Sequence, residues 1–306
     1  MNIGIFDSGF GGLTIFKSIR ALLPQYDYVY LGDNARTPYG NRSFDAIFRF
    51  TKECLDILFA QDCELVVIAC NTASAKALRT IQQKVLPVEY PDRKVLGIIR
   101  PSAEALAGLM PSAGLTPSAG LVPSAAPMQG PVHNVALWAT EGTVKSLSFA
   151  LELEKLAPRL NLIQQVCPML VPLVEAGELE GAGIDYFISK YWQETLAQSR
   201  ADAARRGDNG ASGPTGGIDA LLLACTHYPL LYPKIRALLP PQVRILVQGE
   251  IVAPSLSDYL SRHQEIASVL TRNGTQRFLT TDRTEGFDRL AKVFLGHSVV
   301  SEKVEI

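Results

Sequence analysis

The chain has 306 residues, of which 47% are hydrophobic and 19% charged, and this balance excludes an intrinsically disordered protein. Its 29 basic and 30 acidic residues leave a formal net charge of −1, so the charge favours neither nucleic acid nor an anionic membrane surface as a partner. The length is sufficient for two domains of ordinary size.

The chain shows no sign of membrane insertion or secretion. No apolar run approaches the roughly 18 residues that a membrane-spanning helix requires. The N-terminus enters the apolar pattern "NIGIFDSG" at once, without the features of a signal peptide. We therefore expect a cytoplasmic protein with no membrane partner.

Short apolar runs alternate with helical patterns along nearly the whole chain. Runs of this length between turns and helices are typical of buried parallel strands. The predicted strands are 3–6, 28–31, 65–69, 95–99, 134–139, 162–166, 220–224, 244–247 and 276–280. The predicted helices include 13–23, 43–60, 73–85, 143–156 and 185–205. The alternation predicts an α/β fold of doubly wound parallel sheets.

The first eight predicted strands divide into two similar sets of four. The first strand of each set ends in a loop of small polar residues, "DSGFGG" and "ATEGT", and the third ends in "ACNT" or "ACTH". This repetition predicts two similar lobes that face each other across a cleft, with ligands bound beyond the carboxyl ends of the strands. Because a ninth strand follows the second set, we expect a discontinuous first lobe, 1–99 plus 248–306, and a second lobe of 100–247.

Two segments interrupt the pattern. Residues 111–127 read "PSAGLTPSAGLVPSAAP", a proline-rich repeat that cannot form a regular helix or a central strand. We interpret the stretch of about 110–131 as a surface insertion without a chemical role. Residues 206–217, "RGDNGASGPTGG", read as a second loop.

The chain contains five cysteines, Cys54, Cys63, Cys70, Cys167 and Cys225. An odd number in a chain without a secretion signal argues against a disulfide framework, and no CxxC or HxxxH spacing indicates zinc. Cys54 and Cys63 are expected in the core. Cys70 and Cys225 each follow a strand and precede a helix or turn, where backbone N–H groups favour an anion and lower the pKa of a thiol.

Two thiols in matched positions on two lobes indicate a particular chemistry. One cysteine beside a histidine would suggest acyl transfer. Two thiols on opposite faces of one carbon can instead remove a proton from one side and return one from the other, which inverts a stereocentre. No dinucleotide fingerprint or pyridoxal-phosphate signature is evident, so we expect a reaction that needs neither cofactor nor metal.

Five ordered motifs carry a resemblance to a known family. They are "DSGFGG" (7–12), "LGDNARTPYG" (31–40), "ACNTAS" (69–74), "CPMLVPLVE" (167–175) and "ACTHYPLL" (224–231). In these motifs the chain resembles the glutamate racemases of the cofactor-independent aspartate/glutamate racemase superfamily, from residue 3 to 296 apart from the two interruptions. The resemblance implies an enzyme that interconverts L-glutamate and D-glutamate and supplies D-glutamate for peptidoglycan. We also expect a homodimer.

The resemblance also implies roles for individual residues. Cys70 would take the α-proton from D-glutamate, assisted by Asp7, and Cys225 would take it from L-glutamate, assisted by Glu175 and His227. The implied substrate-binding residues are Asp7, Ser8, Asp33, Pro38, Tyr39, Gly40, Asn71, Thr72, Thr143, Thr226 and His227. No role follows for Cys167, which we interpret as structural.

Two segments depart from the family pattern. Arg100 and Ser102 stand in "IIRPS", where an acidic or small residue and glycine are more usual, and "LVQGE" (246–250) lacks the usual Asp-Ser. Neither departure involves the thiols, so they bear on specificity and domain closure more than on the reaction. The alternatives are a racemase of aspartate or another amino acid, or a two-lobed amino-acid-binding protein. A one-cysteine decarboxylase relative is disfavoured because both thiols are present.

Overall fold

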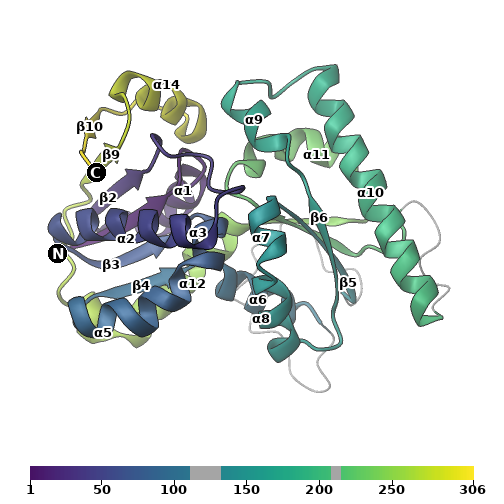
Figure 1. Ribbon diagram of the computed structural model, residues 1–306, viewed down its shortest axis with the longest axis horizontal. Coiled ribbons are helices and arrows are strands. Elements are labelled where there is room, and N and C mark those ends of the chain that lie inside the picture. The colour runs from purple at the N-terminus through teal and green to yellow at the C-terminus, as the bar shows by residue number, and fades with distance from the viewer. Residues whose placement is uncertain (111–131, 208–214) are drawn as a thin grey trace. The chain divides into compact units, whose positions relative to one another are not determined.

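The computed structural model describes residues 1–110, 132–207 and 215–306 (Figure 1). The predicted insertion, apart from residue 110, and most of the second predicted loop lie outside these residues. The chain divides into two compact units, which we call unit 1 (Met1–Pro101 with Gly249–Ile306) and unit 2 (Ser102–Gln248). Each unit contains one sheet in which every strand pairing is parallel, so the predicted α/β class with two parallel-sheet lobes is confirmed.

Unit 1 is built on a six-stranded sheet with the order β10-β9-β2-β1-β3-β4. Its strands are β1 (Asn2–Asp7), β2 (Tyr28–Gly32), β3 (Cys63–Ile68), β4 (Lys94–Gly97), β9 (Gln276–Thr280) and β10 (Ser301–Lys303). The strand predicted at 276–280 is β9, and it pairs in parallel with β2. The C-terminal part of the chain therefore completes the sheet with which the chain begins.

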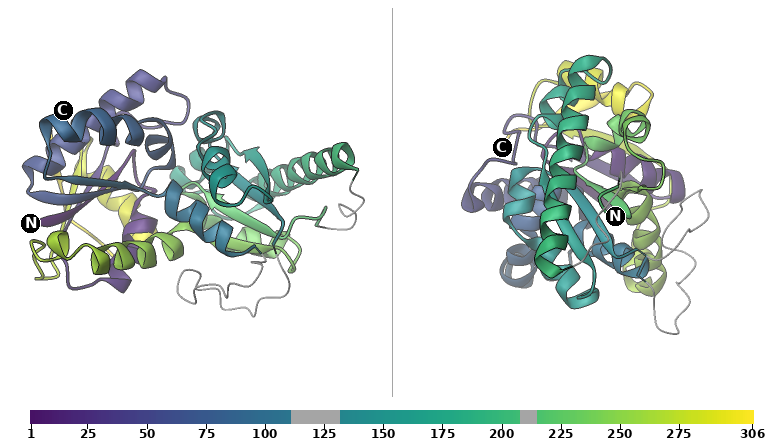
Figure 2. Two further views of the ribbon diagram at one scale, coloured as in Figure 1. Left: turned by 90° about the horizontal axis from the view of Figure 1, so that it is seen from below. Right: turned by 90° about the vertical axis from the view of Figure 1, so that its right-hand side faces the viewer.

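The helices of unit 1 follow from apolar stripes and local caps. They are α1 (Leu13–Leu22), α2 (Phe44–Ala60), α3 (Asn71–Lys76), α4 (Leu78–Thr80), η1 (Ile81–Val85), α5 (Leu86–Glu89), α13 (Gln264–Ala267) and α14 (Thr284–Leu295). The Ser43 side chain caps α2 by accepting a hydrogen bond from the N–H of Ala46. On the inner face of α2, Cys54 is fully buried, and Cys63 at the start of β3 is buried too, so both core predictions are confirmed. The left view of Figure 2 shows helices on both sides of this sheet.

Unit 2 contains a four-stranded sheet with the order β6-β5-β7-β8. Its strands are β5 (Asn134–Ala139), β6 (Asn161–Val166), β7 (Ala220–Ala224) and β8 (Arg244–Val247), and its helices are α7 (Glu141–Lys145), α8 (Ser148–Leu156), α9 (Leu170–Glu175), α10 (Ala182–Arg206), η2 (Tyr228–Leu231) and α11 (Tyr232–Leu238). The buried Trp138 of β5 donates a hydrogen bond of 3.0 Å to Thr195 of α10, which joins this helix to the sheet. Two further helices, α6 (Ile99–Gly108) and α12 (Gln248–Arg262), span the boundaries between the units.

Several predicted elements differ from the observed ones. The helix predicted over 73–85 begins at Asn71 and is divided into α3, α4 and the wide turn η1. Pro87 follows that turn and has no N–H with which to continue the helical ladder. The helix predicted over 143–156 is two helices, α7 and α8, because Leu147 adopts a left-handed backbone conformation (φ +57°). The predicted strand 95–99 ends at Gly97, and α6 begins two residues later.

The carboxyl ends of the central strands bring the candidate residues of each unit together. In unit 1, Phe6 of β1 pairs with Leu31 and Ile68, so the loops after β1, β2 and β3 leave the same edge of the sheet. In unit 2, Ala139 of β5 pairs with Val166 and Ala224, which aligns the ends of β5, β6 and β7 in the same way. Among the described residues, no helix is long and apolar enough to cross a membrane.

Candidate active site

Cys70 lies at the N-terminus of α3, directly after the strand β3. Its Sγ accepts a hydrogen bond from the N–H of Ala73 at 3.5 Å, so the thiol acts as the cap of this helix. The hydroxyl of Ser8 lies 3.2 Å from the same sulfur. Both groups can donate to a thiolate, and Cys70 is only 5% exposed. The surroundings of Cys70 therefore support the charged form of this thiol with neutral donors.

Asp7 ends the neighbouring strand β1 and is fully buried. Its Oδ2 accepts a hydrogen bond of 3.0 Å from the N–H of Gly9. Gly12 passes so close that a Cβ there would lie 2.5 Å from the Cβ of Asp7, so only glycine fits at this position. The buried Tyr30 donates to the carbonyl of Gly9 at 3.0 Å, and burial together with the charge of Asp7 raises the pKa of Tyr30 well above its usual range. Tyr30 thus remains a donor that fixes the loop after Asp7.

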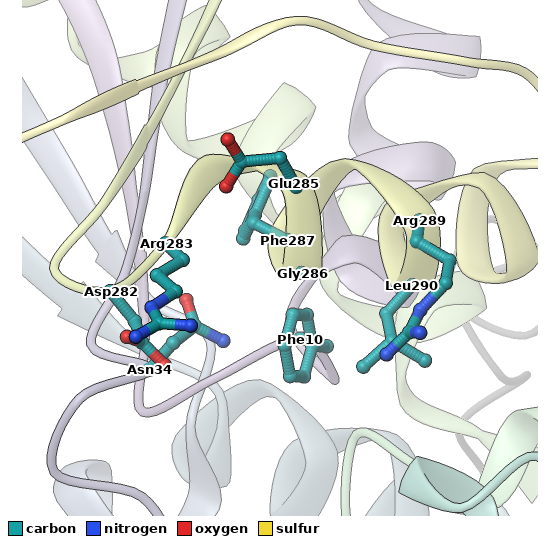
Figure 3. A pocket seen from close by; sticks show the side chains of 9 residues that line it. All are labelled: Phe10, Asn34, Asp282, Arg283, Glu285, Gly286, Phe287, Arg289 and Leu290. Atoms are coloured by element: carbon teal, nitrogen blue, oxygen red, sulfur yellow. The ribbon is translucent and has the colours of Figure 1, made fainter.

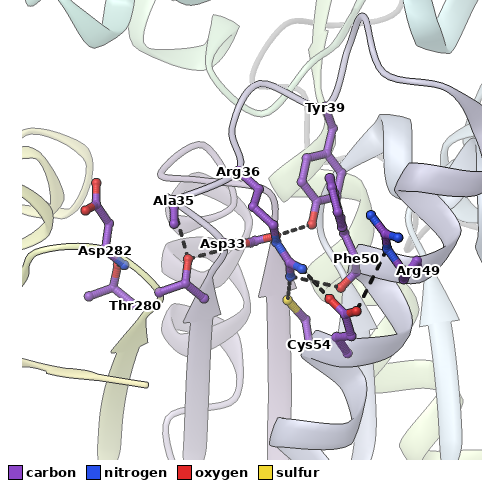
Figure 4. Close-up of polar contacts among 11 residues, drawn as sticks. Asp33, Ala35, Arg36, Tyr39, Arg49, Phe50, Cys54, Thr280 and Asp282 are labelled. Carbon is purple, nitrogen blue, oxygen red and sulfur yellow. Dashed lines mark hydrogen bonds and ion pairs between the residues drawn. The ribbon is translucent and has the colours of Figure 1, made fainter. Parts of the chain in front are cut away.

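The loop between β2 and α2 contains Asp33, Pro38, Tyr39 and Gly40. Asp33 is fully buried, and its carboxylate accepts the hydroxyl hydrogen of Tyr39 within the loop itself (Figure 4). Tyr39 is 2% exposed, whereas Pro38 is exposed and Gly40 partly exposed. Pro38 and Gly40 at the tip of this loop are thus accessible to solvent, whereas the buried side chains of Asp33 and Tyr39 hold the loop in place.

Asn71 and Thr72, the other predicted site residues of unit 1, form the first turn of α3. They follow Cys70 directly and are 4% and 3% exposed. The predicted residues of this unit therefore lie on the loops and helix that follow β1, β2 and β3, at the same edge of the sheet.

Cys225 lies at the equivalent position of unit 2, directly after β7. Its Sγ is 4.0 Å from Nδ1 of His227, and Nε2 of His227 is 3.0 Å from a carboxylate oxygen of Glu175, the last residue of α9. Burial alone lowers the pKa of His227, but the hydrogen bonds and charges of Cys225 and Glu175 outweigh burial and raise the pKa to about 10. His227 is therefore an imidazolium at neutral pH. It can donate to the thiolate of Cys225 through one nitrogen and to Glu175 through the other.

The remaining candidates of unit 2 lie at the same sheet edge. Thr143 of α7 is fully buried, and its hydroxyl is 3.2 Å from that of Thr140, the residue between β5 and α7. Thr226, next to Cys225, is 5% exposed. Cys167 follows β6 and is fully buried; burial and the charge of Cys225 raise the pKa of its thiol well above the usual range, which agrees with a structural cysteine.

Two residues that depart from the family pattern contact each other. Nε2 of Gln248 donates a hydrogen bond of 2.9 Å to Oγ of Ser102, and the two residues are 1% and 0% exposed. The sequence presents them as two separate departures about 150 residues apart. In the structure they form a buried polar contact between the first and the last residue of unit 2.

A separate pocket of about 880 Å³ lies in unit 1 beside α14 (Figure 3). Its lining comprises Phe10, Asn34, Asp282, Arg283, Glu285, Gly286, Phe287, Arg289 and Leu290, none of which is a predicted site residue. The two arginines are balanced by an aspartate and a glutamate, and these four charged side chains are exposed to solvent. The pocket therefore offers no charge that would select an anion or a cation, and the candidate site is assigned to the strand ends.

Thr281 is a residue that the sequence analysis did not identify. It follows β9 and its hydroxyl hydrogen-bonds to the carboxylate of Asp33 at 2.9 Å. The sequence signal was the "TTD" at the end of a predicted strand, which resembles the polar strand ends elsewhere.

Among the described residues, no group of three or more His, Cys, Asp or Glu side chains is placed to hold a metal ion.

Comparison with known proteins gives a consistent result. No family model matches the chain. A protein of Paracoccus denitrificans named glutamate racemase is 38% identical over 299 residues, which is 98% of each chain. The structure of a glutamate racemase from Francisella tularensis in complex with D-glutamate matches with a TM-score of 0.76 at 26% identity, covering 100% of this chain and 97% of that one. A glutamate racemase from Thermus thermophilus in complex with β-chloro-D-alanine matches with a TM-score of 0.69 at 28% identity over the same shares of the two chains.

Proposed function

The chain belongs to the glutamate racemase family, and from this premise we propose that Cys70 and Cys225 interconvert L- and D-glutamate as two bases that act on opposite faces of the α-carbon. One observation carries this proposal. In each unit a buried cysteine follows a strand that pairs with the first strand of the sheet, β3 beside β1 and β7 beside β5. A hydrogen-bond donor lies beside the sulfur in both cases. A single base would have to move from one face of the substrate to the other, whereas two thiols need not move.

The reaction from L-glutamate starts at Cys225. Its thiolate removes the α-proton, the C–H electron pair remains on the α-carbon, and the thiol of Cys70 delivers its proton to the opposite face. The new C–H bond gives D-glutamate and leaves Cys70 as the thiolate. The reverse reaction starts from that state. For another forward turnover, the thiol of Cys225 releases its proton to water and the thiolate of Cys70 takes one up. No electrons are gained or lost, so the scheme needs no redox cofactor.

The neighbouring groups support this scheme by stabilising each thiolate. The imidazolium of His227, held by Glu175, donates toward Cys225, and the N–H of Ala73 with the hydroxyl of Ser8 does so for Cys70. Asp7 is the last residue of β1, the strand that pairs with the one before Cys70. We assign to Asp7 the binding of the substrate ammonium group and assistance to the Cys70 thiol.

We assign the substrate contacts in the same way. Asn71, Thr72, Thr143 and Thr226 would hold the α-carboxylate and ammonium groups, and the tip of the loop with Pro38 and Gly40 would bind the side-chain carboxylate. We further propose that the enzyme is a cytoplasmic homodimer whose product enters peptidoglycan synthesis. Neither nucleic acid nor membrane is a partner in this proposal.

One experiment tests the proposed function directly. The purified enzyme is incubated in heavy water with L-glutamate, and separately with L-aspartate and L-alanine, and optical rotation and α-deuterium are followed. We expect racemisation of glutamate, with deuterium in the early product while unreacted substrate stays largely protiated. A preference for aspartate would assign another substrate within the superfamily. Equal deuterium in substrate and product from the first turnovers would exclude the two-base scheme.

A further inference from the structure

The loop that connects β2 to α2 is organised around one buried carboxylate. Asp33 is fully buried and accepts hydrogen bonds from Nε of Arg36 at 2.7 Å, from the hydroxyl of Tyr39 and from the hydroxyl of Thr281 at 2.9 Å (Figure 4). Two of these donors belong to the loop itself. Thr281 comes from a segment 248 residues further along the chain.

The strand register explains why Thr281 lies beside this loop. β2 and β9 are parallel neighbours in which Gly32 is opposite Thr280, so the next residues, Asp33 and Thr281, leave the sheet side by side. The Thr281 hydroxyl makes two contacts there. It donates to Oδ1 of Asp33 and accepts a hydrogen bond of 3.0 Å from the N–H of Ala35. A hydroxyl can donate and accept at the same time, whereas a methyl group of the same size can do neither.

A second anchor joins the loop to α2. The guanidinium of Arg36 binds Glu53 as well as Asp33, and it lies 4.2 Å from the ring centroid of Phe50. The Phe50 ring in turn packs against Tyr39, with 5.8 Å between ring centroids. Burial by itself lowers the pKa of Arg36, but hydrogen bonds to Glu53 and Asp33 raise it, so the charge of this anchor is constant at any ordinary pH.

We propose that Thr281 is a positioning residue for substrate recognition: through Asp33 it holds the Pro38–Gly40 tip in the conformation that binds the side-chain carboxylate of the substrate. The Arg36–Glu53 pair holds the same loop from the other side. Thr281 is 7% exposed and acts without touching the substrate. This inference rests on the proposed function, because it takes from it the role of the loop tip.

A role in side-chain recognition has a distinct kinetic consequence. The side-chain carboxylate is remote from the α-carbon, and its charge does not change as the proton is transferred. Interactions with it therefore stabilise the bound substrate and the transition state equally, and their loss raises KM without lowering kcat. The effect is the same for both enantiomers, in contrast to a change beside one thiol.

The test replaces Thr281 by valine, which keeps the shape and removes the hydroxyl, and by serine, which keeps the hydroxyl. We expect the Thr281→Val enzyme to show a KM about tenfold higher for both L- and D-glutamate, with kcat within about twofold of wild type. Thr281→Ser should restore KM to near the wild-type value. Thr51→Val is the matched control, since Thr51 is fully buried in the same unit and its hydroxyl has no hydrogen-bond partner in the structure. Its KM should be unchanged.

A second variant covers the case in which Thr281→Val fails to fold. Glu53 is partly exposed on α2, so Glu53→Gln should fold and weaken only the Arg36 anchor, raising KM a few-fold for both enantiomers. An unchanged KM in the folded Thr281→Val enzyme would overturn the inference. If Thr281→Val is unfolded, an unchanged KM in Glu53→Gln would do so. An equal rise of KM in the control Thr51→Val would also overturn it. Absence of glutamate racemisation by the wild-type enzyme would instead overturn the proposed function and this inference with it. The two failures are therefore distinguishable.

Discussion

Cys70 and Cys225 occupy the same place in their respective sheets, yet their surroundings differ. Cys70 caps a helix and is contacted by an amide and a hydroxyl, both neutral. Cys225 precedes a short 3-10 turn and faces an imidazolium that is paired with Glu175. The strand end supplies the position of the thiol, and each unit supplies a different means of stabilising its charge. Two chemically identical thiols should therefore respond differently to pH and to substitution of their neighbours.

The largest effect should come from removing either thiol. Cys70→Ser and Cys225→Ser should each lower kcat at least about a thousandfold in both directions, because a serine hydroxyl is a far weaker acid and its alkoxide is inaccessible near neutral pH. Circular dichroism should show both variants folded, and optical rotation measures their turnover. A folded Cys225→Ser enzyme that racemises at near wild-type rate would contradict the two-base scheme.

Removing one neighbour of each thiol compares how much the charged and the neutral donor contribute to kcat. His227→Asn removes a charged donor and should lower kcat by roughly a hundredfold, whereas Ser8→Ala removes a neutral donor and should lower it by about fivefold. Each variant should slow one direction more than the other in kcat. In every variant, kcat/KM must stay equal in the two directions, because the enantiomers have equal free energies in water. Initial rates from pure L- and pure D-glutamate measure both quantities, and a larger loss in Ser8→Ala would reverse our ranking of the two environments.

The charged neighbour of Cys225 should also make unit 2 sensitive to pH. The pKa of His227 is raised to about 10 in the folded protein, against about 6.5 in an unfolded chain. Below pH 6.5 the imidazole is protonated in both states, and its stabilising contribution is fully present. As pH rises from about 6.5 to about 10, the unfolded chain loses this proton while the folded protein retains it, so the contribution is progressively lost.

Chemical unfolding at a series of pH values measures this loss. The free energy of unfolding of the wild type, minus that of His227→Asn, should decrease across that window and level off above it. A difference that increases with pH would show that His227 is neutral in the folded protein, contrary to the ion pair with Glu175.

The sequence predicts this architecture well where local patterns determine it. Four strands, at 134–139, 220–224, 244–247 and 276–280, have the predicted bounds because their apolar runs end at polar loops. The strand β10 was missed because it is a short polar edge strand, "SEK", with a single neighbour. The break at Leu147 was missed because an ordinary leucine gives no sign of a left-handed conformation.

The candidate site divides in the same way. Both thiols follow from the repeated strand ends, and Glu175 from the family motif that contains it. The "TTD" at the end of the last predicted strand marks Thr281 as a polar strand end, but its contact with Asp33 could not be predicted, since that contact depends on the pairing of β9 with β2. The contact of Gln248 with Ser102 likewise joins distant parts of the chain.

The smallest effect is expected at Cys167, which tests whether a strand end alone suffices to make a thiol reactive. Cys167 follows β6, next to β5 in the same sheet as Cys225, but its Sγ donates to the carbonyl of Gln165 at 3.7 Å. Burial and the charge of Cys225 raise the pKa of its thiol well above the usual range, so Cys167 stays protonated at neutral pH. Cys167→Ala should therefore leave kcat and KM within about twofold of wild type. It should lower the free energy of unfolding by about 1 kcal/mol, the cost of a small cavity in the core.

Alkylation of the native enzyme followed by peptide mass analysis should modify Cys70 and Cys225 and leave Cys167 untouched until the protein unfolds. Rapid labelling of Cys167, or loss of turnover in a folded Cys167→Ala enzyme, would show that position at the sheet edge, more than the neighbouring donors, determines the reactivity of these cysteines.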